Sequence, residues 1–160
     1  MKKCLNICCG RLQKKSTADE EWINIDKADV KPSDLSIQFL QLDIQQGLPY
    51  ETSAIDHIDA IACLGQIIGN DEFLFVMNEL WRVLKSSGTI YIVLPHMDFP
   101  HAYLDPFNQR HFNELSWQCF DERHSQYINH NSYYGFKPWR GVDVKTNPNG
   151  FLEINMTVSK

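Results

Sequence analysis

The sequence predicts an α/β domain whose mostly parallel sheet ends in an antiparallel hairpin. Five short apolar runs, each followed by a turn residue, favour strands at residues 5–8, 22–25, 36–42, 57–62 and 89–94. One long amphipathic segment separates the last two runs, as a helix crossing between parallel strands would. Strict alternation of apolar and polar residues near the end of the chain indicates the hairpin.

The fifth run, Thr-Ile-Tyr-Ile-Val-Leu at residues 89–94, is apolar and β-branched without clean alternation. Such a run is typical of a strand that is covered on both faces, as in a parallel sheet between two helical layers. Pro95 is expected to end this strand, because proline cannot donate a hydrogen bond to the sheet.

An amphipathic helix is predicted over residues 71–85. Its apolar positions recur at helical spacing and are Phe73, Val76, Met77, Leu80 and Leu84. Asp71 and Glu72 in the first turn and Lys85 in the last turn match the helix dipole. Gly88 is expected to stop the helix at its C-terminal end.

The last third of the chain predicts a second helix and the hairpin. The helix begins near Asn113, with Trp117 and Phe120 facing inward. Residues 142–144 alternate and residues 147–150 form a turn. Strict alternation then follows at Leu152, Ile154, Met156 and Val158.

The first two connections between strands are short. Residues 10–22 and 26–36 leave little room for complete crossover helices, which need about a dozen residues or more. We therefore expect helices on that side of the sheet to be short or missing.

Length and composition indicate one ordinary globular domain spanning residues 1–160, with 43% apolar and 22% charged residues. The net charge of −5 argues against a nucleic-acid partner, because such proteins carry a clustered positive field. No apolar run approaches the ~20 residues of a membrane span, and the apolar start is too short for a signal peptide. Five irregularly spaced cysteines favour reduced thiols in the cytoplasm and complete no metal site.

An aspartate follows each of the second and third predicted strands. In open parallel sheets, ligands bind at the carboxyl ends of the strands. Asp26 follows the second strand, and its carboxylate is suited to accept hydrogen bonds from a ribose diol. Leu42 and Asp43 follow the third strand and could cover an adenine ring and accept from its amine. Both aspartates could instead be ordinary turn or cap residues. Gly10 would let the backbone approach a ligand closely or simply make a tight turn.

Phosphate-binding signatures are absent. The chain holds neither Gly-x-Gly-x-x-Gly nor Gly-x-x-x-x-Gly-Lys-Ser/Thr. Nicotinamide-dependent reductases and P-loop nucleotide-binding proteins are therefore disfavoured.

Four segments in order, LNICCG, WINID, QLDIQQGLPYETSAIDHIDAIACLGQII and ELWRVLKSSGTIYIVLP, resemble small class I S-adenosylmethionine-dependent methyltransferases. The likeness is greatest to the compact bacterial methyltransferase-domain type, and DPFNQRHFNELSWQCF and the tail hairpin extend it over nearly the whole chain. This resemblance implies a Rossmann-like sheet, with S-adenosylmethionine as the cofactor.

The resemblance also implies roles for individual residues. The segment from Asn6 through Cys8 and Cys9 to Gly10 would form the loop beside the methionine part of the cofactor. Asp26 would hold the ribose, Leu42 and Asp43 would flank the adenine, and Cys63 and Leu64 would line the cofactor after the fourth strand.

Three residues depart from the family pattern. Cys8 stands where glycine is usual, and its side chain could crowd the cofactor. Gly65 and Gln66 stand where Glu and His are frequent. These departures motivate an alternative hypothesis, a non-catalytic module that binds S-adenosylmethionine or S-adenosylhomocysteine.

The segment after the fifth strand should border the acceptor. His96 and His111 are the candidates for a general base, and Arg110 is the candidate for binding an anionic acceptor. The same residues could instead organise a surface loop. The resemblance implies a small-molecule or glycan acceptor and leaves the oligomeric state open.

Overall fold

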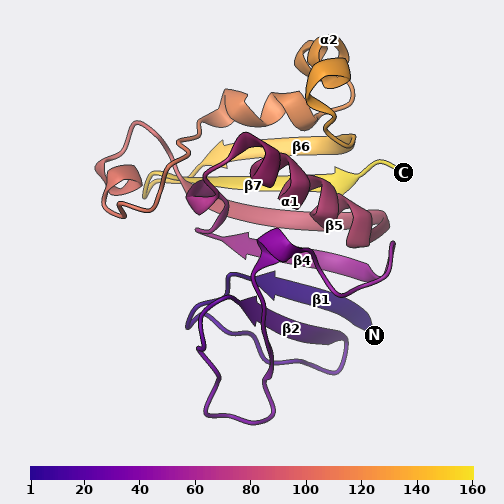
Figure 1. The fold of residues 1–160 in the computed structure, drawn as a ribbon, viewed down its shortest axis with the longest axis vertical. Helices are drawn as coiled ribbons and strands as arrows, with labels where there is room; N and C mark the ends of the chain where they lie inside the picture. The colour runs from indigo at the N-terminus through magenta and orange to yellow at the C-terminus, as the bar shows by residue number, and fades with distance from the viewer.

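The computed structural model describes residues 1–160 and contains one seven-stranded sheet with the strand order β3-β2-β1-β4-β5-β7-β6 (Figure 1). The strands are β1 (Lys2–Ile7), β2 (Glu20–Asp26), β3 (Gln38–Gln41), β4 (Ile55–Ile61), β5 (Leu84–Pro95), β6 (Trp139–Thr146) and β7 (Phe151–Val158). The first five strands pair in parallel, and β7 lies antiparallel between β5 and β6. The Rossmann-like fold with a C-terminal hairpin is confirmed.

The main helix is α1 (Asn70–Val83), which connects β4 to β5. The predicted stop at Gly88 is wrong, because the chain passes from Val83 directly into β5, where Leu84 pairs with Ile55 of β4. Burial of Val83 and Leu84 in the core ends the helix there, and Gly88 lies inside β5.

Neither early connection contains a helix, as the short spacings predicted. Residues 8–19 and 27–37 cross the sheet as irregular loops. The helix α1 lies over one face of the sheet, in front of the strands in Figure 1. The second face therefore has no helical layer over the N-terminal strands.

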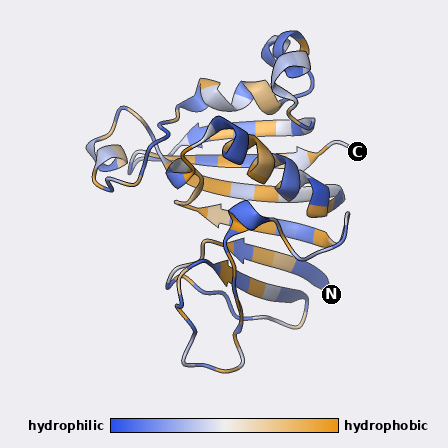
Figure 2. Ribbon diagram, viewed as in Figure 1, coloured by the Kyte–Doolittle hydropathy of each residue, from blue (hydrophilic) through white to orange (hydrophobic).

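The burial of β5 corrects the expectation that this strand is covered on both faces. Ile90, Ile92 and Leu94 are buried, whereas Tyr91 and Val93 are only half-buried on the other face. The strand alternates because only the side facing α1 belongs to the hydrophobic core. Figure 2 shows apolar segments of the central strands lying beneath α1.

The segment after β5 contains four further short elements. They are η3 (Pro100–Tyr103), η4 (Glu114–Phe120), α2 (Ser125–Tyr134) and the β6–β7 hairpin. The predicted helix near Asn113 forms as the 3₁₀ helix η4, with Asn113 as its N-cap and with Trp117 and Phe120 buried. The sequence pattern missed α2, which buries none of its residues.

Two single-turn 3₁₀ helices follow strands of the parallel half, η1 (Ile44–Gln46) after β3 and η2 (Leu64–Gln66) after β4. Both begin close to the carboxyl ends of their strands, where the candidate site lies. None of the helices has the length and apolar character needed to cross a bilayer.

Candidate functional site

A cavity of about 200 Å³ lies at the carboxyl ends of β1, β2 and β4, beside η1 and η2. Its walls are formed by Cys8, Asp26, Lys27, Leu42, Asp43, Ile44, Gln45, Ala62, Cys63, Gln66 and Ile67. Residues from four separate connections thus meet at the edge of the sheet where open α/β folds bind ligands.

Five residues predicted for the cofactor line this cavity: Cys8, Asp26, Leu42, Asp43 and Cys63. They lie at or just after the carboxyl ends of β1, β2, β3 and β4, so the fold brings together side chains as far apart in the chain as Cys8 and Cys63.

The other four predicted residues do not line it. The Asn6 side chain lies against the neighbouring strand and the loop after β1, because its amide donates to Asn24 Oδ1 and to the Leu12 carbonyl. Cys9 and Leu64 are buried in the core. Gly10 does not line the cavity, and its backbone, in the left-handed region at φ 48°, donates a hydrogen bond to Asp26.

The Asp26 carboxylate joins two loops. Its Oδ2 accepts a hydrogen bond from the Gly10 N–H at 2.8 Å, and its Oδ1 accepts from the Ala28 N–H at 2.9 Å. An ionised carboxylate offers about four acceptor positions, so two remain for a ligand. Asp26 therefore both orders the β1 loop and presents free acceptor capacity to the cavity.

Asp43 is half-buried and caps η1. Its Oδ1 accepts from the Gln45 N–H at 3.0 Å, and the second oxygen makes no hydrogen bond. Leu42 beside it contributes an apolar wall, since it packs against the core and lines the cavity. The cap interpretation and the ligand interpretation of this aspartate are therefore compatible.

Two non-glycine residues at the cavity have left-handed backbones, Cys8 at φ 51° and Ala62 at φ 56°. They follow the paired strands β1 and β4, which leave the sheet side by side. A hydrogen bond with Cys63 and burial raise the pKa of the Cys8 thiol well above its ordinary value. The thiol is thus a neutral, weakly reactive part of the wall.

Sequence reasoning missed six residues of the cavity: Lys27, Ile44, Gln45, Ala62, Gln66 and Ile67. All of them except Ile67 lie within two positions of a predicted residue, so the strand-end signal extends to its neighbours. Gln66 is in addition one of the departures from the family pattern.

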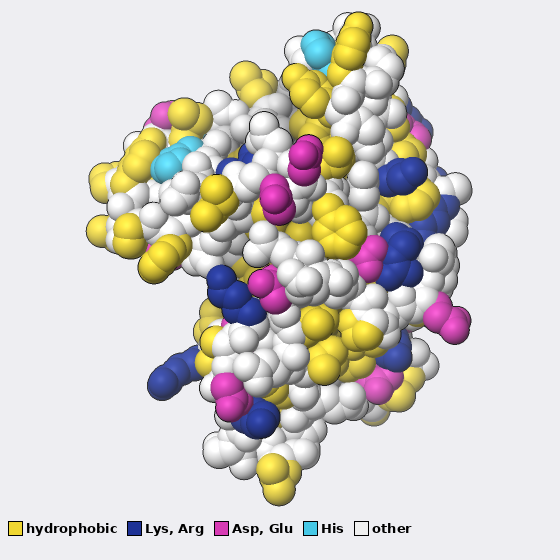
Figure 3. All heavy atoms as spheres, viewed as in Figure 1, with side chains coloured by type: hydrophobic (Ala, Val, Ile, Leu, Met, Phe, Trp, Pro, Cys, Tyr) yellow, Lys and Arg dark blue, Asp and Glu magenta, His cyan; other side chains and the backbone are white.

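A second, more open cavity of about 630 Å³ adjoins the first. It is lined by Lys27, Gln45, Gln66, Ile68, Gly69, Glu72 and Phe107. Lys27, Gln45 and Gln66 belong to both cavities and mark their boundary. Figure 3 shows a recess on the left side of the molecule, beneath the lobe formed by the segment after β5.

The sequence profile of a family described as "Methyltransferase domain" matches residues 15–92, which carry β2 to most of β5. This part of the chain is therefore similar to the methyltransferase domain family. The resemblance that the sequence motifs indicated is thereby confirmed, and S-adenosylmethionine is the cofactor of enzymes with this domain.

Solved structures share the fold of this chain at low sequence identity. An S-adenosylmethionine-dependent methyltransferase from Aquifex aeolicus is 13% identical with a TM-score of 0.67, over 99% of this chain and 82% of that one. One from Archaeoglobus fulgidus is 12% identical with a TM-score of 0.68, over 98% and 86%. No curated protein matches the sequence.

A third similar structure is a complex from Haloferax volcanii between the Trm112 methyltransferase activator and a methyltransferase. The similar chain in it is 11% identical with a TM-score of 0.67, over 99% of this chain and 83% of that one.

Gly65 and Gln66, which depart from the family pattern, hold the segment after β5 in place. The Gly65 carbonyl accepts from the N–H groups of Gln109 and Arg110 at 2.9 and 3.0 Å. A Cβ at Gly65 would lie 3.2 Å from Asn108 Oδ1. Gln66 Nε2 donates to Asp105 Oδ2 at 2.8 Å. A small residue followed by an amide thus docks the loop beside the cavity.

Arg110 already has hydrogen-bond partners within the chain, and its role in binding an anionic acceptor stays a prediction. Its guanidinium donates to the carbonyls of Ile67, Ile68 and Gly69 and lies over the Phe73 ring at 4.6 Å. Burial lowers its pKa. Since these carbonyls precede α1, Arg110 fastens the loop to that helix.

Neither histidine proposed as a base lines either cavity. His96 is buried, its Nε2 lies 3.1 Å from Glu114 Oε2, and its Nδ1 accepts from the Asp98 N–H. His111 stacks on Tyr103, with 4.5 Å between ring centroids. His96 thus joins parts of the loop by hydrogen bonds, whereas His111 Nε2 is buried with no hydrogen-bond partner. The catalytic assignment of both histidines stays a prediction.

Proposed function

We propose that this chain transfers a methyl group from S-adenosylmethionine to a small-molecule or glycan-type acceptor. The observation that carries the proposal is the meeting of Asp26 and Asp43, each with free acceptor capacity, in one cavity at the ends of adjacent strands. Ribose hydroxyls and an adenine amine are the donors that such a pair of carboxylates suits.

The charge of the cavity fits this cofactor. Asp26, Asp43 and Lys27 are its ionised side chains, which gives a net charge of −1 (two carboxylates, one ammonium). S-adenosylmethionine carries a sulfonium, an ammonium and a carboxylate, so its net charge is positive. The surroundings therefore favour the charged donor over neutral S-adenosylhomocysteine.

The volumes of the two cavities support separate places for the parts of the ligand. The first, at about 200 Å³, is smaller than ordinary ligand pockets and would hold the nucleoside. The amino-acid part would extend toward Lys27, Gln45 and Gln66, which belong to both cavities. The acceptor would then approach through the larger cavity.

The cofactor supplies an activated methyl group, so the chain's own residues mainly align the acceptor and exclude water. Gln45, Gln66 and Glu72 offer amide and carboxylate groups to acceptor hydroxyls. The Glu72 side chain makes no hydrogen bond or ion pair of its own, and we assign the general-base role to it in place of His96 and His111.

Calorimetric titration with S-adenosylmethionine and S-adenosylhomocysteine tests the proposal. We expect Asp26→Ala to weaken binding of both at least about tenfold, because charge-assisted hydrogen bonds to the ribose are lost. Asp29→Ala is the matched control in the same loop, since Asp29 is exposed and lines neither cavity.

The absence of any binding by the unmodified chain would overturn the proposal, and equal affinities of the Asp26 and Asp29 variants would overturn the ribose assignment. Binding without methyl transfer to any acceptor in a broad panel would favour the non-catalytic module instead.

A further inference from the structure

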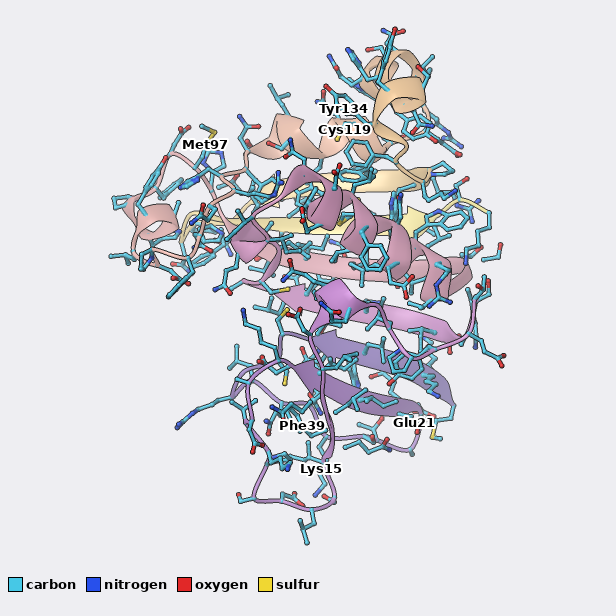
Figure 4. All side chains as sticks on the ribbon, viewed as in Figure 1. Lys15, Glu21, Phe39, Met97, Cys119 and Tyr134 are labelled. Carbon is cyan, nitrogen blue, oxygen red and sulfur yellow. The ribbon has the colours of Figure 1, made fainter.

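Four large apolar side chains are exposed in or near the lining of the larger cavity, and two of them, Ile68 and Phe107, line it. Leu104 is 78% exposed, Phe107 71% and Ile68 69%. Tyr103, Leu104, Phe107 and Ile68 form what we call the apolar rim. Figure 3 shows a lobe rich in apolar atoms at the upper left, and Figure 4 labels Met97 in the same lobe.

The apolar rim is held in place by specific hydrogen bonds. Tyr103 Oη donates to the Met97 carbonyl at 3.0 Å, and the Phe107 N–H donates to Asp105 Oδ1 at 2.9 Å. Asp105 in turn accepts from Gln66. Since the loop is anchored beside its exposed side chains, their exposure is a property of the folded loop.

The apolar rim overlaps the lining of the larger cavity. Ile68 and Phe107 belong to both, and Leu104 lies one residue before Asp105, which is bonded to the cavity residue Gln66. If the polar end of a ligand reached Gln66 or Glu72, the rest of the ligand would extend out of the cavity over this rim. Exposed apolar surface at a cavity mouth commonly marks a binding site.

The charge of the loop argues for a small ligand over a membrane surface. Residues 97–108 contain Asp98 and Asp105 but no Lys or Arg. Attachment to an anionic bilayer relies on clustered cations. The loop therefore offers apolar contact without the electrostatic attraction that a membrane-docking segment needs.

We propose that the methyl acceptor is an amphiphile. Its polar group enters the larger cavity toward Gln45, Gln66 and Glu72, and an attached alkyl or aryl group lies on the apolar rim. This inference rests on the proposed function, because it takes the larger cavity as the acceptor site.

Two glycosides that differ only in their apolar part test the proposal. Octyl β-D-glucoside, below its micelle concentration, and methyl β-D-glucoside are each titrated into the chain saturated with S-adenosylhomocysteine, and binding is followed by NMR. The octyl glycoside is expected to bind at least about tenfold more tightly, because its chain leaves water against Leu104 and Phe107. Its shifts should centre on Ile68, Leu104 and Phe107.

The double substitution Leu104→Ser and Phe107→Ser should abolish the preference for the octyl glycoside. The matched control substitutes Leu35 and Tyr133 by Ser, since these side chains are 96% and 83% exposed and lie outside both cavities. The affinity for S-adenosylhomocysteine is measured for every variant.

Equal affinity for the two glycosides, or a preference that survives the rim substitutions, would overturn the amphiphile proposal while cofactor binding stayed intact. Loss of cofactor binding by the unmodified chain would overturn the proposed function instead. Co-sedimentation with vesicles of phosphatidylcholine and phosphatidylglycerol would show a membrane-docking loop and contradict the small-ligand form.

Discussion

Cys8 combines backbone strain with an intrusion into the cavity. Its φ of 51° lies in the left-handed region, which is unfavourable for residues with a Cβ. The same turn presents its thiol to the cavity beside Cys63. Glycine at this position would remove the strain and the side chain together, so the departure from the family pattern has two separable effects.

Cys8→Gly is expected to bind S-adenosylmethionine several-fold more tightly, because the cavity widens. Its thermal stability should change little, since relief of about 1 kcal/mol of strain offsets the lost packing of a half-buried side chain. Ser53→Gly is the control, because Ser53 has a φ of 62° but lines neither cavity. Calorimetry showing equal affinity for the two variants would disprove crowding.

At the scale of elements, loops cover a face of the sheet that crossover helices would cover in larger α/β folds. The loop after β1 covers the sheet face with Lys14, which pairs with the buried Asp59 of β4 and lies over the Trp22 ring at 4.0 Å. Asn6 and Asn24 hydrogen-bond beside it at 2.9 Å. A layer of paired polar side chains thus seals a face that has no helix.

Asp59 makes this layer sensitive to acid. Burial alone would raise the pKa of its carboxyl, but hydrogen bonds from His57 and Lys14 outweigh burial and hold the pKa below its ordinary value of 3.8. The carboxyl therefore contributes stability above its unfolded pKa, and this contribution is lost as pH falls through the folded pKa.

Asp59→Asn should destabilise the chain by about 2 kcal/mol at neutral pH, because Lys14 and His57 lose a charged partner. Thermal unfolding of both proteins from about pH 7 to about pH 3 checks this, and the gap between them should shrink at the acid end. A gap that is constant with pH would refute the electrostatic explanation.

The contact between η2 and the segment after β5 can also be tested. Gly65→Ala should push Asn108 away and loosen the loop, because the new Cβ would lie 3.2 Å from Asn108 Oδ1. Hydrogen exchange at Gln109 and Arg110, whose N–H groups bond the Gly65 carbonyl, should accelerate. Adding Asn108→Ala should slow it again, and unchanged exchange in Gly65→Ala would contradict the docking role.

At the scale of the whole molecule, one ligand would bridge four connections of the sheet. The first cavity draws on the loops after β1, β2, β3 and β4, and none of them holds a binding site alone. Ligand binding to the assembled site should therefore stabilise the entire fold, because the unfolded chain cannot present these residues together.

Saturation with S-adenosylmethionine at about 100 times its Kd should add about 2.7 kcal/mol to the free energy of unfolding, which raises Tm by about 5–10 °C. Differential scanning calorimetry checks the shift and its dependence on ligand concentration. Asp26→Ala should show a smaller shift at the same concentration, and an identical shift would place the ligand elsewhere.

The sequence by itself determined the strands, the main helix, the terminal hairpin and the short early connections, because these follow from local periodicity and turn residues. It also pointed to Asp26 and Asp43, since a carboxylate at the end of a parallel strand has a known place in the fold. The sequence could not predict that Lys27, Gln45 and Gln66 lie between the two cavities, because these residues meet only after strands far apart in the chain have paired.

Only the tertiary structure determined the surroundings of His96, Arg110 and His111. Their residue types suit catalysis, but local sequence does not reveal which hydrogen-bond partners a loop will find when it folds back. Arg110 is occupied by the carbonyls before α1, while Glu72 on that helix keeps an unpaired carboxylate at the cavity. The difference arises from long-range packing, which places one side chain against backbone and leaves the other facing solvent.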